Sequence, residues 1–327
     1  MGKLVHGEWH DEWYDTKSTQ GAFVRGDSSF RDRVTRDGSS GLRAEPGRYH
    51  LYVSLACPWA CRTLVFRKLK KLEDAISISI VDPVMGEQGW AFTDYPGCIP
   101  DTLNGFSYLH QVYTAAKPDY TGRVTVPVLF DKQTKKIVNN ESSEIIRMFN
   151  REFDQFADAA LDFYPTPLRA EIDAINVVVY DDVNNGVYKA GFATAQSAYE
   201  QAFDALFARL DELEQRLSRR RYLVGDRITE ADWRLFTTLV RFDAVYVSHF
   251  KCNLRRLVDY ENLWGYTRDL YQVPGIPETV NLDHIKRHYF MSHPTINPTR
   301  IVPKGPALDF TTAHQRRNLA ASSSESL

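Results

Sequence analysis

The sequence predicts an α/β domain followed by an all-helical domain, and three observations support this fold class. The chain has 327 residues, which suits two domains of ordinary size. Between residues 46 and 160, strand-like segments are joined by helical segments and short connections. After residue 165 the strand signal largely stops and helical periodicity replaces it. We therefore expect a sheet with helices in the first part and helices alone in the second.

The composition excludes several classes of protein. With 43% hydrophobic and 25% charged residues, the chain resembles an ordinary globular protein, and its net charge of −2 gives no global basic field for nucleic acid. No apolar run approaches the roughly 18 residues of a membrane span, and the chain starts without the apolar segment of a secretory signal. Four cysteines in so long a chain fit a reducing compartment. We expect a cytoplasmic protein without nucleic-acid or membrane partners.

The first elements follow a polar N-terminal extension at residues 1–45, which we expect to be irregular and to wrap the body through its aromatic residues. A strand is predicted at 48–53, a helix begins at Pro58, and a second strand covers 76–81. Pro58 suits a first helical position, where its missing N–H costs no hydrogen bond. A strand, a helix and a strand joined so closely predict a right-handed parallel βαβ unit.

The second half of the α/β domain follows a loop-rich insertion at 82–122, which contains several Pro and Gly residues. A strand interrupted by Pro127 is predicted at 124–130, and a short return strand starts at Ile137. Asn140-Glu-Ser-Ser143 then offers N-cap side chains for the next helix. The α/β domain therefore runs from 46 to 160, in the order β-α-β and then β-β-α.

The second domain is expected at 165–303, with amphipathic helices near 168–185, 196–217, 229–244, 255–271 and 276–290. The third of these starts with Thr229-Glu-Ala-Asp232, a capping box with Asp in place of Glu. A C-terminal tail follows at 304–327, and its Ser-rich end at 320–327 is expected to be disordered.

Cys57 is the strongest candidate for chemistry. It lies between a strand and a helix, directly before Pro58, where unpaired backbone N–H groups and the helix dipole favour the thiolate and lower the thiol pKa. Arg62 adds a positive charge nearby. A thiolate at the end of a parallel strand is well placed for thiol exchange. The alternative interpretation is a buried structural cysteine that precedes a helix.

The other cysteines carry a weaker signal. Cys61 lies one helical turn after Cys57, and the spacing is not the Cys-x-x-Cys of a redox pair, so packing is its favoured role. A disulfide between Cys57 and Cys61 stays open. Cys98 and Cys252 have no metal-ligating neighbours at a recognisable spacing, and their roles stay open too. We expect no metal site.

Two further segments suit an extended ligand with charged ends. A cis peptide at Val126-Pro127 would expose the backbone of Val126 for pairing with a peptide-like ligand. Otherwise Pro127 only interrupts an edge strand. At the next helix start, the backbone N–H groups and Ser142 can hold a carboxylate, and Glu141 can hold an ammonium group. Plain helix capping is the alternative for this pair.

Together these features resemble the glutathione transferases, which have a thioredoxin-like N-terminal domain and an all-α C-terminal domain. More closely, the sequence resembles the glutathionyl-hydroquinone reductases, the Xi class of that superfamily, from about residue 6 to about residue 303. The segments that carry the resemblance include Tyr49-His-Leu-Tyr-Val-Ser-Leu-Ala-Cys-Pro-Trp-Ala60, Gly122-Arg-Val-Thr-Val-Pro127, Asn140-Glu-Ser142, Ile146-Arg-Met-Phe-Asn150, Asn184-Asn-Gly-Val-Tyr-Lys-Ala-Gly-Phe192, Leu239-Val-Arg-Phe-Asp243 and His288-Tyr-Phe290. One departure is Cys61, because family members often carry His there.

The resemblance implies glutathione-dependent reduction of glutathionyl-hydroquinones to hydroquinones through a Cys57–glutathione mixed disulfide, with release of oxidised glutathione. It makes Cys57 the nucleophile, Tyr188 the acid/base, and Tyr289 a second tyrosine on the hydroquinone side. Glutathione is the co-substrate, and the residues that the resemblance implies for holding it are Trp90, Arg123, Val124, Thr125, Val126, Glu141 and Ser142. It also implies a homodimer joined through the C-terminal domains.

Two other functions stay open on the sequence. An omega-type or glutaredoxin-like thiol transferase, acting on dehydroascorbate or mixed disulfides, would need neither tyrosine. A non-enzymatic scaffold of the glutathione transferase type, used for protein interaction, would not need the intact elements Cys57-Pro58 and Glu141-Ser142.

Overall fold

Two compact units make up the chain, and the computed structural model describes residues 2–320. The first unit takes in the residues up to Trp13, then Gly26–Asp162 and Glu278–Val302. The second takes in Tyr14–Arg25, Phe163–Pro277 and the residues from Pro303 on. Each unit is therefore built from stretches that are not consecutive in the chain. The domain boundaries expected at 46–160 and 165–303 stay a prediction.

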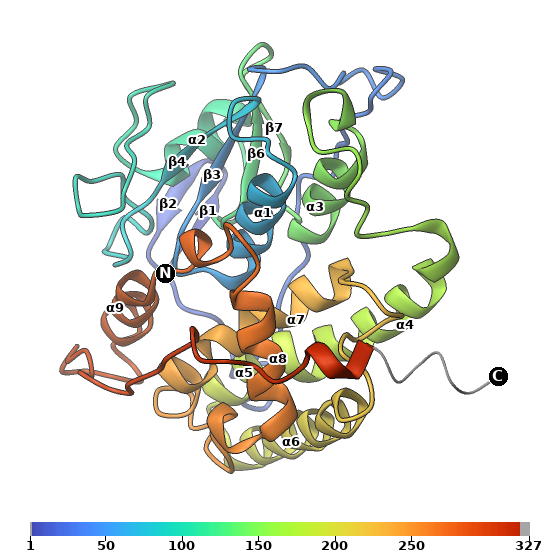
Figure 1. The fold of residues 1–327 in the computed structure, drawn as a ribbon. Coiled ribbons are helices and arrows are strands. Elements are labelled where there is room, and N and C mark those ends of the chain that lie inside the picture. The colour runs from blue at the N-terminus through green and yellow to red at the C-terminus, as the bar shows by residue number, and fades with distance from the viewer. Residues whose placement is uncertain (1, 321–327) are drawn as a thin grey trace. The chain divides into compact units, whose positions relative to one another are not determined.

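A four-stranded sheet with the order β4-β3-β6-β7 forms the centre of the first unit (Figure 1). β3 (Tyr49–Val53) and β4 (Ile76–Ile80) pair in parallel, as the βαβ prediction requires. β6 (Val128–Asp131) is antiparallel to β3, and β7 (Lys136–Asn139) is antiparallel to β6. The predicted order β-α-β and then β-β-α is confirmed.

The strand expected at 124–130 is shorter at its start than the sequence suggested. β6 begins at Val128, after a cis peptide bond between Val126 and Pro127. Pro127 has no N–H to donate to a neighbouring strand, so the ladder starts only beyond it. Residues 124–126 therefore form a loop next to the sheet rather than a part of it.

Two helices of the first unit lie side by side, α1 (Pro58–Leu69) and α3 (Ser142–Arg151) (Figure 1). Pro58 is the first residue of α1, as predicted, and apolar side chains such as Phe66 are fully buried. Glu141 caps α3 with its side chain, which confirms the N-cap chemistry expected there.

The extension and the insertion hold more structure than the irregular segments that we expected. β1 (Lys3–Val5), β2 (Glu8–His10) and β5 (Gly122–Arg123) form a second, antiparallel sheet with the order β2-β1-β5. These strands are too short to show alternation in the sequence, and β1 pairs with β5 from a distant part of the chain. Gly7 makes the turn between β1 and β2 with a φ of 83°.

The insertion also contains a helix, α2 (Leu109–Ala116). The Gln111 side chain accepts the backbone N–H of Tyr108 at the start of this helix, and Tyr108 occupies the N-cap position where Ser or Thr usually signals a helix start. The helix has only 8 residues and buries Val112 and Tyr113. A segment this short, surrounded by Pro and Gly, gives too little periodicity to stand out from a loop.

The second unit is helical, as predicted. Its longer helices are α4 (Arg169–Val179), α5 (Gly186–Gly191), α6 (Gln196–Leu217), α7 (Glu230–Arg241) and α8 (Glu261–Tyr271). α6 has the predicted bounds, and the predicted capping box at the start of α7 is present. π-helical turns at Tyr180–Asn184 and Phe242–Tyr246 continue α4 and α7.

The last two predicted helices begin later than expected. 3₁₀ turns at Leu257–Asp259 and Pro277–Thr279 occupy the predicted starts of α8 and α9 (Leu282–Ser292). Asn281 caps α9 by accepting a hydrogen bond from the His284 N–H, which fixes the later start. α9 belongs to the first unit.

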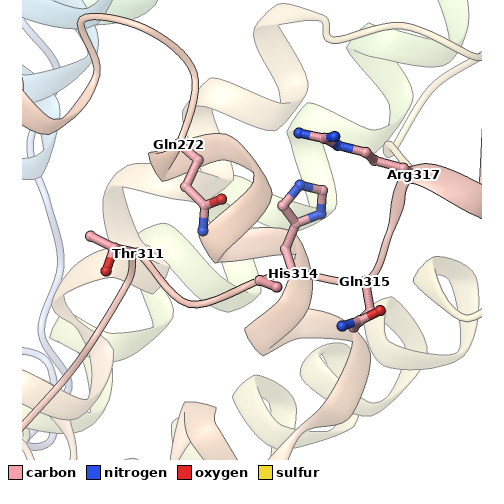
Figure 2. A pocket seen from close by; sticks show the side chains of 6 residues that line it. Gln272, Thr311, His314, Gln315 and Arg317 are labelled. Atoms are coloured by element: carbon pink, nitrogen blue, oxygen red, sulfur yellow. The ribbon is translucent and has the colours of Figure 1, made fainter.

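A cavity of about 470 Å³ lies in the second unit, between the end of α8 and the C-terminal segment (Figure 2). The residues that line it are Gln272, Thr311, Ala313, His314, Gln315 and Arg317, and none of them is a predicted site residue. The disorder expected at 320–327 falls, apart from residue 320, outside the described residues. Within residues 2–320, every helix is too short or too polar to cross a membrane.

Candidate active site

Cys57 occupies the N-cap of α1 with an extended backbone (φ −74°, ψ 124°). Its side chain is half-buried, and its Sγ lies 3.6 Å from the carbonyl oxygen of Val126. The thiol therefore lies at the N-terminus of a helix and next to the loop that precedes the cis-proline. The helix N-terminus is the position predicted for Cys57, where the first N–H groups of a helix favour a negative charge, whereas the contact with Val126 was not predicted.

The other cysteines differ from Cys57 in their surroundings, although all four are free thiols. Cys61 is fully buried, with its Sγ 3.6 Å from the carbonyl oxygen of Thr279. Burial raises the pKa values of the Cys98 and Cys252 thiols, which makes them poor nucleophiles at neutral pH. Among residues 2–320, no group of three or more His, Cys, Asp or Glu side chains is arranged to hold a metal ion.

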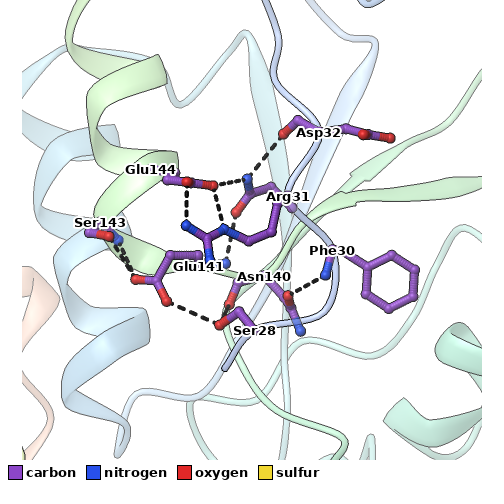
Figure 3. Close-up of polar contacts among 9 residues, drawn as sticks. Ser28, Phe30, Arg31, Asp32, Asn140, Glu141, Ser143 and Glu144 are labelled. Carbon is purple, nitrogen blue, oxygen red and sulfur yellow. Dashed lines mark hydrogen bonds and ion pairs between the residues drawn. The ribbon is translucent and has the colours of Figure 1, made fainter. Parts of the chain in front are cut away.

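Glu141 is held by hydrogen bonds on both of its carboxylate oxygens (Figure 3). Ser143 donates its N–H (3.0 Å) and its hydroxyl (2.8 Å) to Oε1, and Ser28 donates its hydroxyl to Oε2 (3.0 Å). Burial raises the pKa of Glu141, but these hydrogen bonds and the charge of Arg62 outweigh burial and hold the pKa below its usual value. Glu141 is therefore ionised at neutral pH and can face an ammonium group.

Ser142 and Arg62 connect α3 to α1. Ser142 is the first residue of α3, and its buried hydroxyl accepts a hydrogen bond of 3.4 Å from Nη1 of Arg62. Arg62 is only 1% exposed, and its guanidinium carbon lies 4.4 Å from the ring centre of Trp59. A carboxylate, a guanidinium and a helix N-terminus thus gather at the start of α3. This combination suits a ligand end that carries both an ammonium and a carboxylate group.

Residues 28–32 of the N-terminal extension run along this start of α3 (Figure 3). Phe30 and Asn140 exchange two hydrogen bonds of 3.1 Å, one from each backbone N–H. Arg31 binds Glu144 with two of its nitrogens. Sequence reasoning missed the contact of Ser28 because its partner lies 113 residues away, and only the structure brings the two together.

Tyr113 of α2 joins the loop before Pro127 to the segment before α3. Its hydroxyl donates to the carbonyl of Thr125 (2.8 Å) and accepts from the Thr125 N–H (3.2 Å) and from Nδ2 of Asn140 (3.3 Å). One donated and two accepted hydrogen bonds use the full capacity of a hydroxyl. Complete burial raises the pKa of Tyr113 to about 12, so the hydroxyl keeps its proton. Tyr113 thereby fixes the residues next to Val126 and Glu141.

We expect Tyr113→Phe to lower the free energy of unfolding by about 1–3 kcal/mol, because it leaves the buried N–H of Thr125 and the amide of Asn140 with one partner fewer. Urea denaturation measures this loss. Tyr49→Phe is the matched control, since Tyr49 is also fully buried in the first unit but donates to a single carbonyl, that of Arg43. An equal or larger loss for Tyr49→Phe would contradict the special role of the Tyr113 hydroxyl.

The remaining predicted residues of the first unit have defined surroundings. Arg123 donates its guanidinium N–H groups to the backbone carbonyls of Glu12 and Trp13. Val124 and Val126 are buried, and Thr125 is half-buried. Arg123 thus ties the N-terminal strands to the loop that leads to Val126.

Trp90 and Tyr289 each pack against a histidine. Trp90 contacts His288, which lies in α9, and Tyr289 contacts His293, which directly follows α9. Trp90 is stacked on His288, with ring centres 4.8 Å apart and 19° between the ring planes. Tyr289 is 1% exposed, and its ring meets His293 edge-on at 5.7 Å. The insertion and α9 therefore share one aromatic cluster in the first unit.

Tyr188 lies in α5 of the second unit, directly after the π-helical turn. It is 8% exposed, and its ring packs among Phe192, Tyr246 and Phe250. The guanidinium of Arg25 lies over the same ring, 4.9 Å from its centre. Sequence reasoning did not single out Arg25, since no local pattern marks it.

Known proteins match almost the whole chain. Residues 56–152 match the glutathione S-transferase N-terminal domain, and residues 196–269 match the C-terminal domain. The glutathionyl-hydroquinone reductase YqjG of Escherichia coli (strain K12) is 58% identical over 323 residues, which are 97% of this chain and 98% of YqjG. The glutathionyl-hydroquinone reductase PcpF of Sphingobium chlorophenolicum is 56% identical over 307 residues, which are 94% and 97% of the two chains.

Solved structures agree with these matches. The Xi-class glutathione transferase from Natrialba magadii has a TM-score of 0.91 and 51% identity, and the comparison covers 97% of each chain. The glutathione-bound structure of YqjG has a TM-score of 0.89 and 54% identity, with 96% of this chain and 99% of that chain covered. The predicted glutathione transferase fold is therefore confirmed. This chain belongs to the glutathione S-transferases and, within them, to the Xi class of glutathionyl-hydroquinone reductases.

Proposed function

We propose that this protein reduces glutathionyl-hydroquinones to hydroquinones, with glutathione as the reductant and Cys57 as the nucleophile. The observation that carries the proposal is the half-buried thiol at the N-terminus of α1, 3.6 Å from the Val126 carbonyl oxygen. It occurs in a chain that is 58% and 56% identical to two glutathionyl-hydroquinone reductases.

The proposed reaction has two steps. In the first, Tyr188 gives its proton to the ring carbon that bears sulfur, while a ring hydroxyl loses its proton to water and becomes a ketone. The Cys57 thiolate then attacks the glutathione sulfur, the C–S bond breaks, and its electron pair returns to the ring. The ring oxygen takes up a proton from water, so that the hydroquinone leaves and a Cys57–glutathione disulfide remains.

In the second step, the thiolate of another glutathione attacks this disulfide, and oxidised glutathione leaves with the Cys57 thiolate restored. The hydroquinone has then gained the two electrons that the two glutathione sulfurs lost. One cysteine suffices for this cycle, which fits the absence of a Cys-x-x-Cys pair from the sequence.

Glutathione, in this proposal, is held along the first unit. Glu141 faces the ammonium of its γ-glutamyl end, and Ser142 with the N-terminus of α3 faces the carboxylate beside it. The backbone of Val126 pairs with the cysteinyl part, which brings the glutathione sulfur to Cys57. Arg123, Val124, Thr125 and Trp90 complete the set, and Tyr289 orients the hydroquinone. In support, one solved relative is described as glutathione-bound.

Two features of the whole molecule belong to the same proposal, a cytoplasmic location and a homodimer, and the homodimer rests on the resemblance to the Xi class. We place the protein in the cytoplasm, in agreement with its four free cysteines. We also expect a homodimer joined through the helical C-terminal part of the chain. Light scattering of the purified protein would give a monomer mass if the second expectation is wrong.

The experiment that tests the proposed function is turnover of glutathionyl-menadiol in the presence of glutathione. We expect one menadiol and one oxidised glutathione for each adduct consumed, and no more than a single turnover per protein chain without free glutathione. Reduction of dehydroascorbate without turnover of the adduct would instead support an omega-type thiol transferase. Binding to a glutathione column without turnover of either compound would support a non-enzymatic scaffold.

Glu141→Ala tests the glutathione end of the proposal. Loss of a charged, hydrogen-bonded partner is worth about 1.5–3 kcal/mol, so we expect the Kd for glutathione to rise tenfold or more. Calorimetric titration measures this change, and the alkylation rate of Cys57 stays the same. Glu144→Ala is the matched control, because Glu144 lies in the first turn of the same helix and binds Arg31. Equal weakening in both variants would assign the effect to the helix rather than to Glu141.

A further inference from the structure

A cation from the N-terminal extension lies against Tyr188. The guanidinium carbon of Arg25 is 4.9 Å from the centre of the Tyr188 ring. The Arg25 Nε donates a hydrogen bond of 2.9 Å to Oδ1 of Asn185, the residue directly before α5. The same guanidinium lies 5.3 Å from the ring centre of Phe23. Asn185 and the two rings therefore fix the guanidinium on Tyr188, within the second unit.

The other neighbours of Tyr188 are mostly apolar. Phe192 and Phe250 meet its ring at 5.7 and 5.4 Å, and Tyr246 meets it at 6.1 Å. Lys189 follows in the sequence, but its ammonium forms an ion pair with Asp181. A negative charge on the Tyr188 oxygen would be costly in such apolar surroundings without a positive charge close by.

We propose that Arg25 is a positioning residue of the reaction, which holds the Tyr188 ring in place and stabilises the phenolate formed when Tyr188 gives up its proton. The inference rests on the proposed role of Tyr188 as the acid. In that step the O–H bond of Tyr188 breaks, the proton goes to the ring carbon of the substrate, and the electron pair stays on the Tyr188 oxygen. The phenolate regains a proton from water before the next turnover.

The expected size of the effect follows from the position of the cation, because the guanidinium carbon lies 4.9 Å from the centre of the ring over which the phenolate charge is partly spread. An opposite charge within about 4–6 Å changes a proton equilibrium by roughly 10- to 1,000-fold. Only part of that change appears in the rate, because the proton is only partly transferred in the transition state. We therefore expect Arg25→Gln to lower the kcat for glutathionyl-menadiol by roughly 10- to 100-fold.

The experiment compares Arg25→Gln and Arg25→Lys on two substrates, glutathionyl-menadiol and the mixed disulfide of glutathione with mercaptoethanol. Arg25→Gln should lower kcat only on the aryl adduct and leave the KM for glutathione unchanged. Arg25→Lys keeps a cation and should recover most of the activity. Arg169→Gln is the matched control, since Arg169 lies in the same unit with its guanidinium 5.0 Å from the ring centre of Tyr164. This variant should keep wild-type rates.

The double variant of Arg25→Gln and Tyr188→Phe separates an effect on the phenolate from a structural one. If Arg25 acts through the Tyr188 hydroxyl, removing Arg25 from the Tyr188→Phe protein causes no further loss. A multiplied loss in the double variant, or an equal loss on both substrates, would overturn the inference. Should Arg25→Gln unfold, Arg25→Met keeps the aliphatic contacts and allows the same comparison.

Failure of this inference is distinguishable from failure of the proposed function. Full activity of Tyr188→Phe on the aryl adduct would remove the acid role of Tyr188 itself. Impaired Tyr188→Phe together with a fully active Arg25→Gln would overturn the role of Arg25 alone.

Discussion

Replacement of Cys57 with serine is expected to lower the turnover of glutathionyl-hydroquinones by roughly 10⁴–10⁶-fold, the scale on which enzymes lose activity when their nucleophile is removed. A serine hydroxyl at the same helix N-terminus is almost fully protonated at neutral pH, so it cannot attack the glutathione sulfur. Binding of glutathione should change little, because the groups proposed to hold it are untouched. Steady-state kinetics and calorimetric titration of the same protein sample measure the two quantities.

Cys98→Ser is the control for this experiment. Cys98 is also half-buried in the first unit, but it lies in the insertion, with its Sγ 3.6 Å from the carbonyl of Val81. We expect wild-type rates for this variant. Wild-type turnover by Cys57→Ser, or a comparable loss in Cys98→Ser, would place the nucleophile elsewhere.

Tyr188→Phe is expected to lower turnover of aryl-glutathione adducts by roughly 10²–10⁴-fold, the usual scale for acid–base catalysis. The variant keeps the ring, and with it the packing against Phe250, and removes only the hydroxyl that carries the proton. Reduction of a simple mixed disulfide needs no proton on a ring carbon, so its rate should not change. The decisive quantity is the ratio of the two rates, turnover of the aryl adduct and reduction of the mixed disulfide, measured on one preparation of the variant and one of the wild type.

Tyr289→Phe provides a graded comparison. It should act in the same direction as Tyr188→Phe but more weakly, because in our proposal Tyr289 only orients the hydroquinone. Equal losses on both substrates in either variant would mean that these tyrosines support the site in general. An unchanged rate of Tyr188→Phe on the aryl adduct would mean that Tyr188 is not the acid.

Local sequence patterns predicted the helix starts that carry Cys57 and Glu141, but not the helix that carries Tyr188, which lies between the predicted helices 168–185 and 196–217. Pro58 at the first helical position and Glu141 before α3 are signals that lie within a few residues of the elements they start. The β-α-β and β-β-α order followed from strands of four or five residues with clear flanking turns. Patterns of this kind depend only on neighbours in the chain, so one sequence suffices to recognise them.

Contacts between distant segments could not be predicted in this way. Ser28 reaches Glu141 across 113 residues, and Arg25 reaches Asn185 across 160 residues. The hydroxyl of Tyr113, which lies on a helix that the sequence did not reveal, joins two loops. Such contacts form only when the chain folds back on itself, and the residues involved carry no local mark. The N-terminal extension, which the sequence predicts to be irregular, therefore contributes to the surroundings of both Glu141 and Tyr188.

The central claim is that Cys57 accepts the glutathionyl group from the aromatic ring. The most direct test mixes the protein with glutathionyl-menadiol in the absence of free glutathione and follows a single turnover by mass spectrometry. We predict that one menadiol is released per protein chain and that the peptide containing Cys57 gains one glutathionyl group, which added glutathione then removes. Release of menadiol without this adduct, or a glutathionyl group on Cys61, Cys98 or Cys252 instead, would contradict the account.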